Sequence, residues 1–258
     1  LNVPTNSTDA GTYEIKVSGE GNYTGEVTKI YTISASSSGS VYVSLNETDF
    51  TYNGVVQKPT VTSVTYNGTS LVAGTDYTVV NIPESKDAGT YSATVMLSTN
   101  YGSKTGTAEY RIAPATIGNG DVILRGTNFI YNGGEQRPTV AVTVGGRTLT
   151  VNMDYTLNVP TNSTDAGTYE ITVEGEGNYT GEVTKIYTIS AVSSGSVYVS
   201  LNETDFTYNG VVQKPTVTSV TYNGTALVAG RDYTIVNIPE SKDAGTYSAT
   251  VMLSANYG

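Results

Sequence analysis

One five-residue motif, Asp-Ala-Gly-Thr-Tyr, occurs four times in the sequence, and an alternating run of apolar and polar residues follows each copy. That alternation is the period of a half-buried β-strand. A tyrosine that enters a strand and bonds through its hydroxyl to upstream backbone is a tyrosine corner, a feature of two-sheet β-sandwiches. Gly suits the tight turn, and Asp accepts hydrogen bonds from nearby backbone N–H groups. The motif therefore predicts four tyrosine corners, with these residues: Asp9, Gly11, Tyr13, Asp87, Gly89, Tyr91, Asp165, Gly167, Tyr169, Asp243, Gly245 and Tyr247.

A longer repeat contains this motif. Residues 1–102 align without gaps to residues 157–258 and differ at only seven positions. A weaker repeat lies within it, because Tyr-Asn-Gly occurs at residues 52–54, 131–133 and 208–210. The pattern predicts alternating A-type and B-type repeats, so that the chain is expected to be cut from a longer array. The predicted repeats are the C-terminal part of a first B repeat (1–33), a complete first A repeat (41–112), a complete second B repeat (121–189) and a second A repeat without its last strand (197–258).

Each complete repeat is predicted to hold about seven short strands separated by turns, which is typical of a sandwich and not of alternating strands and helices. In the first A repeat the expected strands include residues 41–45, 59–66, 77–82 and a closing strand at 107–112. No stretch shows a helical period. A Ser-rich linker is expected at residues 34–40, and a stiffer linker with Pro and Ile is expected at residues 113–120. The predicted fold class is all-β.

Composition excludes several function classes. The net charge of −10 argues against nucleic acid and anionic membranes as partners, and no apolar run reaches membrane-spanning length. The chain has no His or Cys, so acid/base or nucleophilic chemistry would need paired carboxylates, Lys or Tyr. The repeated acids instead fall in turns, where Asp satisfies backbone donors. We expect neither an enzyme nor a cofactor.

Two further chemistries are weighed and set aside. Glu47-Thr48-Asp49 and Glu203-Thr204-Asp205 offer oxygens for Ca²⁺, but their spacing matches no calcium loop, which favours solvated acids and no metal site. Gln57, Gln136 and Gln213 recur beside basic residues, as in chains that form covalent cross-links between side chains. A polar turn residue before a strand is the favoured interpretation of these glutamines.

Four tyrosines are expected at loop tips, where exposed rings could stack on sugars: Tyr23, Tyr101, Tyr179 and Tyr257. They are the candidate ligand contacts of this chain. Because tyrosine also occurs throughout the predicted strands, a packing role is favoured over a binding role for all four.

The succession Tyr-Asn-Gly, Gln-x-Pro-Thr-Val, Gly-x-Asp-Tyr-Thr, Asp-Ala-Gly-Thr-Tyr and Gly-Asn-Tyr-Thr-Gly resembles bacterial immunoglobulin-like surface repeats of the MBG or Big type. The A repeat departs from the last motif with Thr99-Asn100-Tyr101-Gly102. The resemblance covers nearly the whole chain and implies tandem immunoglobulin-like sandwiches in an elongated array, without catalytic residues.

The function that the resemblance implies is a structural stalk, spacer or fibre on the bacterial cell surface, outside the cell, in an adhesin. Its partners would be neighbouring repeats of the same protein, with host or bacterial glycans or proteins bound through other regions. Two alternatives stay open. The chain could be the subunit of a self-assembling surface filament, joined edge to edge or head to tail. It could also be a weak, multivalent carbohydrate-binding array that gains from avidity.

Overall fold

The computed structural model describes residues 1–5 and 7–258. The described chain separates into two compact units, each treated by itself below. The first unit holds Leu1–Thr116 with Gly175–Thr180, and the second holds Ile117–Glu174 with Gly181–Gly258. The boundaries of the four predicted repeats stay a prediction.

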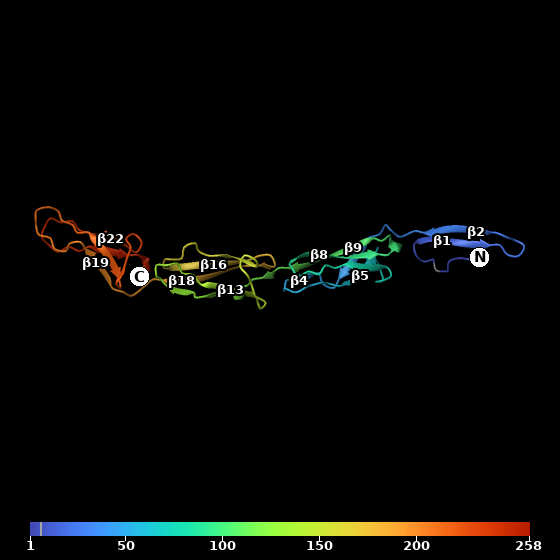
Figure 1. Cartoon of the computed structure of the whole chain (residues 1–258), viewed down its shortest axis with the longest axis horizontal. Helices are drawn as coiled ribbons and strands as arrows, with labels where there is room; N and C mark the ends of the chain where they lie inside the picture. The colour runs from blue at the N-terminus through green and yellow to red at the C-terminus, as the bar shows by residue number, and fades with distance from the viewer. Residues whose placement is uncertain (6) are drawn as a thin grey trace. The chain divides into compact units, whose positions relative to one another are not determined.

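The fold is all-β, as the residue pattern predicts (Figure 1). The only helices of the described residues are single 3₁₀ turns: η1 (Thr99–Tyr101), η2 (Asn119–Asp121) and η3 (Ala255–Tyr257). None of these turns has the length or apolar character that crossing a membrane requires.

The described residues of the first unit form four sheets. A two-stranded hairpin belongs to the first B repeat, and a three-stranded and a four-stranded sheet belong to the first A repeat. The hairpin joins β1 (Gly11–Ser18) and β2 (Glu26–Ile33). The three-stranded sheet has the order β3 (Val41–Leu45), β5 (Val61–Tyr66) and β6 (Thr69–Ser70). The four-stranded sheet has the order β4 (Asp49–Thr51), β9 (Thr105–Ala113), β8 (Gly89–Leu97) and β7 (Tyr77–Asn81). A short parallel pair joins β10 (Ala115–Thr116) and β17 (Tyr179–Thr180).

Side chains of the two larger sheets of this unit share one core. Val64 and Tyr66 of β5 pack with Tyr77 of β7 and with Val95 and Leu97 of β8. Alternate residues of β8 are buried because the strand presents one face to the other sheet. The arrangement is consistent with a β-sandwich.

The second unit repeats the same sheet orders. Its second B repeat has a three-stranded sheet of β11 (Val122–Arg125), β13 (Thr139–Val144) and β14 (Arg147–Thr148). The four-stranded sheet has the order β12 (Asn128–Ile130), β18 (Glu182–Ser190), β16 (Gly167–Gly175) and β15 (Tyr155–Asn158). The second A repeat has a sheet of β19 (Val197–Leu201), β20 (Val217–Tyr222) and β21 (Thr225–Ala226). Its remaining pair is β22 (Tyr233–Asn237) with β23 (Thr250–Leu253).

Within residues 197–258, fewer residues form strands than in the matching part of the first A repeat. Residues 205–207, which match β4, form no strand, and β23 covers only the second half of the length of β8. In the first A repeat, β4 and the first half of β8 both pair with β9. Because β9 has no counterpart within residues 197–258, these segments lack the partner that makes them strands.

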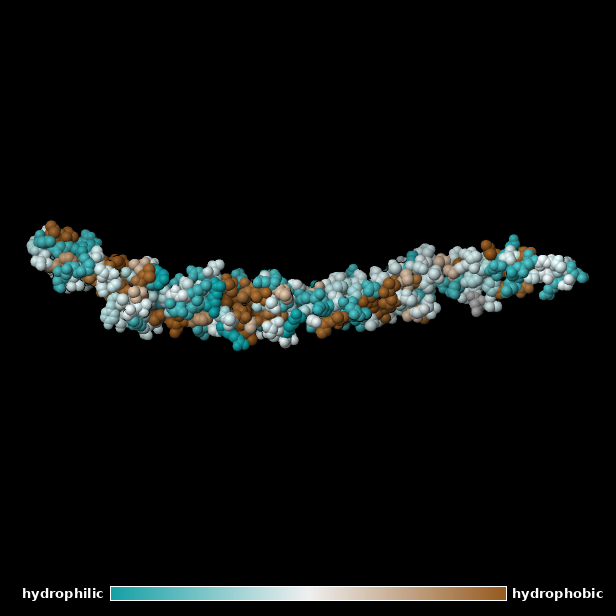
Figure 2. All heavy atoms as spheres, in the orientation of Figure 1, coloured by the Kyte–Doolittle hydropathy of each residue, from teal (hydrophilic) through white to brown (hydrophobic). Residues whose placement is uncertain are grey.

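Apolar side chains are not gathered into one surface on the visible face. Figure 2 shows hydrophobic residues in small, separate patches with hydrophilic residues between them. Scattered exposed apolar side chains are normal on folded proteins and indicate no particular partner.

Candidate functional site: contacts between successive repeats

Each predicted corner tyrosine forms the same hydrogen bond. The hydroxyl donates to the backbone carbonyl of the Asp four residues earlier, at 2.7–3.0 Å, in all four copies: Tyr13 to Asp9, Tyr91 to Asp87, Tyr169 to Asp165 and Tyr247 to Asp243. In the three copies that have a closing strand, the ring also packs on a tyrosine of that strand, with centroids 5.3–5.5 Å apart. The corner fixes the backbone of the Asp-Ala-Gly turn, and that turn is where the next repeat makes contact.

An asparagine of the following repeat binds this turn. The backbone N–H of Ala10 donates to Oδ1 of Asn100 at 2.7 Å, and Nδ2 of Asn100 donates to the Asp9 carboxylate at 2.8 Å. We call this pair of bonds the Asn–Asp contact. One primary amide can accept and donate at once, so a single Asn satisfies both a backbone donor and a carboxylate.

The Asn–Asp contact occurs three times in the described part of the chain. Asn178 binds Ala88 and Asp87 at 2.6 and 3.0 Å, with all of these residues in the first unit. Asn256 binds Ala166 and Asp165 at 2.6 and 2.9 Å in the second unit. The contact therefore joins a B-type corner to an A-type loop twice and an A-type corner to a B-type loop once.

The same asparagines also hold the linkers. Their backbone carbonyls accept a hydrogen bond from a linker N–H group, from Ser36 to Asn100, from Ala115 to Asn178 and from Val192 to Asn256, at 2.8–2.9 Å. Each Asn thus binds the preceding repeat through its side chain and the connecting segment through its backbone. Three hydrogen bonds from one residue restrict the position of the loop more strongly than a linker alone.

The tyrosine that follows each asparagine packs beside the contact. Tyr179 is only 4% exposed, and its ring lies edge-on to Tyr52 with centroids 5.3 Å apart. Tyr257 packs in the same way against Tyr131 of the preceding repeat at 5.5 Å, whereas Tyr101 packs at 5.1 Å against Tyr66 of its own repeat. The Tyr179–Tyr52 and Tyr257–Tyr131 pairs join successive repeats, and edge-to-face pairs of this kind stabilise a contact beyond the area that they bury.

Three of the four candidate ligand-contact tyrosines are not exposed at loop tips, and whether any of the four binds a ligand stays a prediction. Tyr179 is buried, and Tyr101 and Tyr257 are half-buried, because each ring packs on another tyrosine. Tyr23 is the one of the four that lies on an exposed loop, with 79% of its surface accessible.

A buried carboxylate lies at the contact of the second unit. Asp232 is 1% exposed and accepts hydrogen bonds from the Tyr131 hydroxyl at 3.1 Å, the Arg231 guanidinium at 2.8–2.9 Å and the Val228 N–H at 2.8 Å. Burial raises the pKa of Asp232, but the hydrogen bonds outweigh burial and hold the pKa below its ordinary value. Burial and the bond to Asp232 raise the pKa of Tyr131 to about 12. Arg231 is a threonine, Thr75, in the first A repeat.

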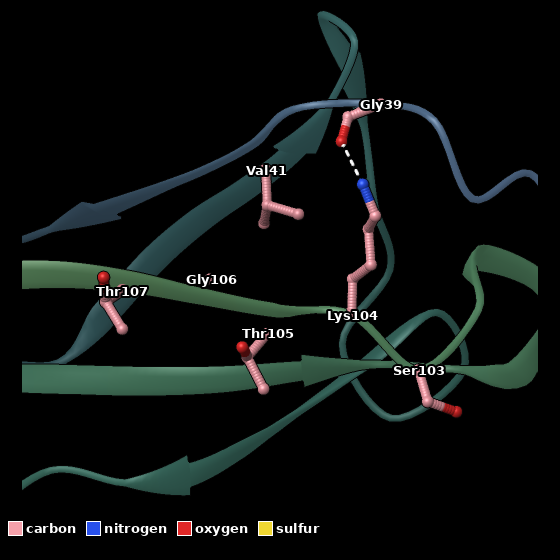
Figure 3. A pocket seen from close by; sticks show the side chains of 7 residues that line it. All are labelled: Gly39, Val41, Ser103, Lys104, Thr105, Gly106 and Thr107. Carbon is pink, nitrogen blue, oxygen red and sulfur yellow. Dashed lines mark hydrogen bonds between the residues drawn. The ribbon is translucent and has the colours of Figure 1, made fainter.

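Side chains of Lys104 and Tyr66 hold the Ser-rich linker of the first unit by hydrogen bonds. Figure 3 shows Lys104 extending from the hairpin before β9 toward Gly39, where Nζ donates to the backbone carbonyl at 2.7 Å. Tyr66 accepts from the Gly39 N–H and donates to the Ser36 carbonyl, both at 2.6 Å. The surrounding pocket is shallow and holds a single cationic group that is already paired. It is therefore part of the linker contact and not a ligand site.

No group of three or more His, Cys, Asp or Glu side chains in the described residues is placed to hold a metal ion. Of the acids considered for Ca²⁺, Asp49 lies in β4, where Thr48 donates to it, and Asp205 accepts from Thr204 in the same way.

The contact asparagines were not identified from the sequence, although a signal exists. The Asp residues of the corner motif recur every 78 residues, and so do Asn100, Asn178 and Asn256. Two motifs with one common period, offset by 91 residues, indicate a pairing between neighbouring repeats. No family model and no curated protein sequence matches this chain.

Proposed function

We propose that this chain is a structural spacer, built from tandem immunoglobulin-like β-sandwich repeats in an elongated array on the surface of a bacterial cell. The observation that carries the proposal is the Asn–Asp contact, which recurs with the same atoms at all three places where one repeat follows another. A spacer needs its modules held at a defined distance and direction, and each contact restricts both. The extracellular and bacterial parts of the proposal are supported by the motif resemblance alone.

The contact suits a spacer because it is short-range and specific. At Asn178, for example, the side chain binds the corner of the preceding repeat, the backbone carbonyl binds the linker, and the adjoining Tyr179 packs on Tyr52 of the preceding repeat. Domains joined only by a flexible linker move relative to one another, whereas these bonds must break before such a motion begins.

Small-angle scattering at low protein concentration tests the proposed array. A compact chain of this length would have a radius of gyration of about 18 Å. We expect a value well above that figure, independent of concentration over the dilute range. A radius near the compact value would overturn the proposal.

Alanine substitution tests the role of the contact. The triple variant Asn100→Ala, Asn178→Ala, Asn256→Ala is expected to stay folded but to show a broader distribution of dimensions, because the linkers then move freely. The matched control is Asn22→Ala, since Asn22 occupies the same loop position but is exposed. Identical scattering from the triple variant and the control would show that the contact does not set the spacing.

A further inference from the structure

The edge strand of the four-stranded sheet carries exposed apolar side chains in the A repeats. In the first A repeat this strand is β7, and beyond a single bridge at Tyr77 no described strand pairs with its outer side. Three apolar side chains lie on β7 and on the neighbouring strand β8, and their counterparts in the second A repeat lie on β22 and β23. Their exposed fractions are 43–62%: Val79, Val80, Met96, Ile235, Val236 and Met252.

The B repeat has polar residues where the A repeat has two of these apolar residues. Its edge strand is β15, and Asn158 at the end of β15 matches Val80. Glu174 of β16 matches Met96 of β8. Charged side chains at an exposed sheet edge oppose pairing with another chain. The B edge therefore has a protection that the A edge lacks.

The A repeat also has a largely apolar groove beside β7. Five of the residues that line it are Pro59, Val61, Tyr77, Val79 and Ile82. In the B repeat Pro160 replaces Ile82, and the Arg137 guanidinium donates to the Pro160 carbonyl at 2.6 Å. Lys58, which matches Arg137, bonds to Glu84 instead. Proline is a second residue that keeps sheet edges from pairing, so the B edge is protected here as well.

Contacts with neighbouring repeats do not account for the difference. The second B repeat follows the first A repeat and precedes the second A repeat, and the apolar edge is exposed in both. The hydrogen bonds and ring pairs described above between successive repeats involve none of residues 77–82 or 233–238. The edge is therefore separate from the contacts that join repeats along the chain.

We infer that two copies of this chain associate side by side, with the β7 or β22 edge of one copy packed against the same kind of edge on the other. Residues 77–82 and 233–238 carry no charged side chain. Two copies with a net charge of −10 repel one another over most of their surface, but this repulsion is smallest where neutral edges meet. A second copy is the occupant because it presents an extended, apolar and uncharged edge at each A repeat.

The contact is made by side chains more than by backbone. The register of β7 on β8 shifts between Val79 and Asn81, which places Val80 at a β-bulge. A bulge interrupts the ladder and bends an edge away from regular pairing. Because few side chains take part and a continuous sheet does not form, we expect a dissociation constant on the order of 0.1–1 mM.

Sedimentation of the full chain from about 10 µM to about 1 mM covers that range of affinity. We expect the mean mass to rise above that of one chain as the concentration increases. A mass that is independent of concentration over this range would overturn the inference.

Residues of the B edge, placed on both A edges, test which surface is responsible. The variant carries Val80→Asn, Met96→Glu, Val236→Asn and Met252→Glu. The B repeat already holds Asn and Glu at the matching positions of its own sheet, so the thermal midpoint should not change. Association should weaken about tenfold or more, because apolar contacts are lost and like charges then face each other.

The matched control is Thr28→Glu with Thr184→Glu. It adds the same two negative charges at exposed strand positions of the B repeats, away from the A edges. The control should associate as the unchanged chain does. Equal association of the control and the edge variant would overturn the inference, because the A edges would then not be the contact.

A cross-linking experiment identifies the contact directly, because the chain has no Cys of its own. Asn81 and Asn158 are both exposed and end the edge strands of an A and a B repeat. Asn81→Cys chains at about 1 mM should form dimers with a short bis-maleimide, and Asn158→Cys chains should not. Equal yields from the two variants would contradict a contact through the A edge. Neither experiment bears on the dimensions of the dilute chain, which test the spacer proposal.

Discussion

A glycine and a tyrosine together fix the Ser-rich linker. A Cβ atom built on Gly39 would lie 2.2 Å from Cζ of Tyr66, and one built on Gly195 would lie 2.3 Å from Cζ of Tyr222. Tyr66 cannot move aside easily, because it is buried in the core and its hydroxyl bonds both Gly39 and Ser36. The linker therefore needs glycine for space at this point, next to residues that sequence composition alone describes as flexible.

Gly39→Ala is expected to destabilise the first unit by about 1–3 kcal/mol, the typical cost of forcing an extra carbon into a packed site. Urea denaturation measures the change. Gly120→Ala is the control, since a Cβ at Gly120 meets no atom within 4 Å. Equal stability of the two variants would mean that the linker shifts away from Tyr66 without cost.

At the scale of elements, β9 determines how much of the A repeat becomes a sheet. Residues 89–93 of β8 pair only with β9, whereas residues 94–97 also pair with β7. Residues 197–258 contain no counterpart of β9, and in them the segment that pairs with β22 is a strand while the residues before it are not. Phe206 and Tyr247 are correspondingly exposed, although Phe50 and Tyr91 are half-buried in the first A repeat.

Hydrogen exchange is expected to separate these identical segments. Backbone amides of residues 89–93 should exchange slowly, because these residues pair with β9. Those of residues 245–249 should exchange quickly, because they have no such partner strand. Mass spectrometry can distinguish the two regions through peptides that reach Thr99 or Ala255. Similar exchange rates in the two segments would show that the corner strand forms without β9.

The sequence predicts the strands well where alternation and turns coincide. The strand at residues 41–45 has the predicted bounds, and the closing strand at residues 107–112 lies within β9. Alternation reports which face of a strand is buried, and turn residues report where the strand stops, so such segments need no tertiary information.

The contacts between repeats were harder to predict, for a physical reason. Asn100 is an ordinary polar loop residue by composition, and its role depends on Asp9, which lies 91 residues away. The parallel pairing of β10 with β17 was missed likewise, because two residues show no period. Tyr179 was expected at an exposed tip because a polar, Gly-rich loop gives no sign of the surface that covers it.

At the scale of the whole molecule, the chain is a series of modules whose stability includes a term from each neighbour. In repeat proteins the total stability is approximately the sum of the stabilities of the modules and the contributions of the interfaces between neighbouring modules. The interface contribution should matter most where the sheets are smallest. In the second unit these are the sheets of residues 197–258, and Asn256 of that segment binds the second B repeat.

Asn256→Ala is therefore expected to unfold the second A repeat selectively. The substitution leaves the Ala166 N–H and the Asp165 carboxylate without this partner, at a cost of about 1–3 kcal/mol. Hydrogen exchange of β20 and β22 should accelerate, while β16 and β18 keep their protection. Asn100→Ala removes the same bonds in the first unit, but β5 and β8 should stay protected because the first A repeat retains its four-stranded sheet. If the A repeats of the two variants are equally protected from hydrogen exchange, the folding of a repeat does not depend on its Asn–Asp contact. The contact would then act on the spacing of the repeats alone.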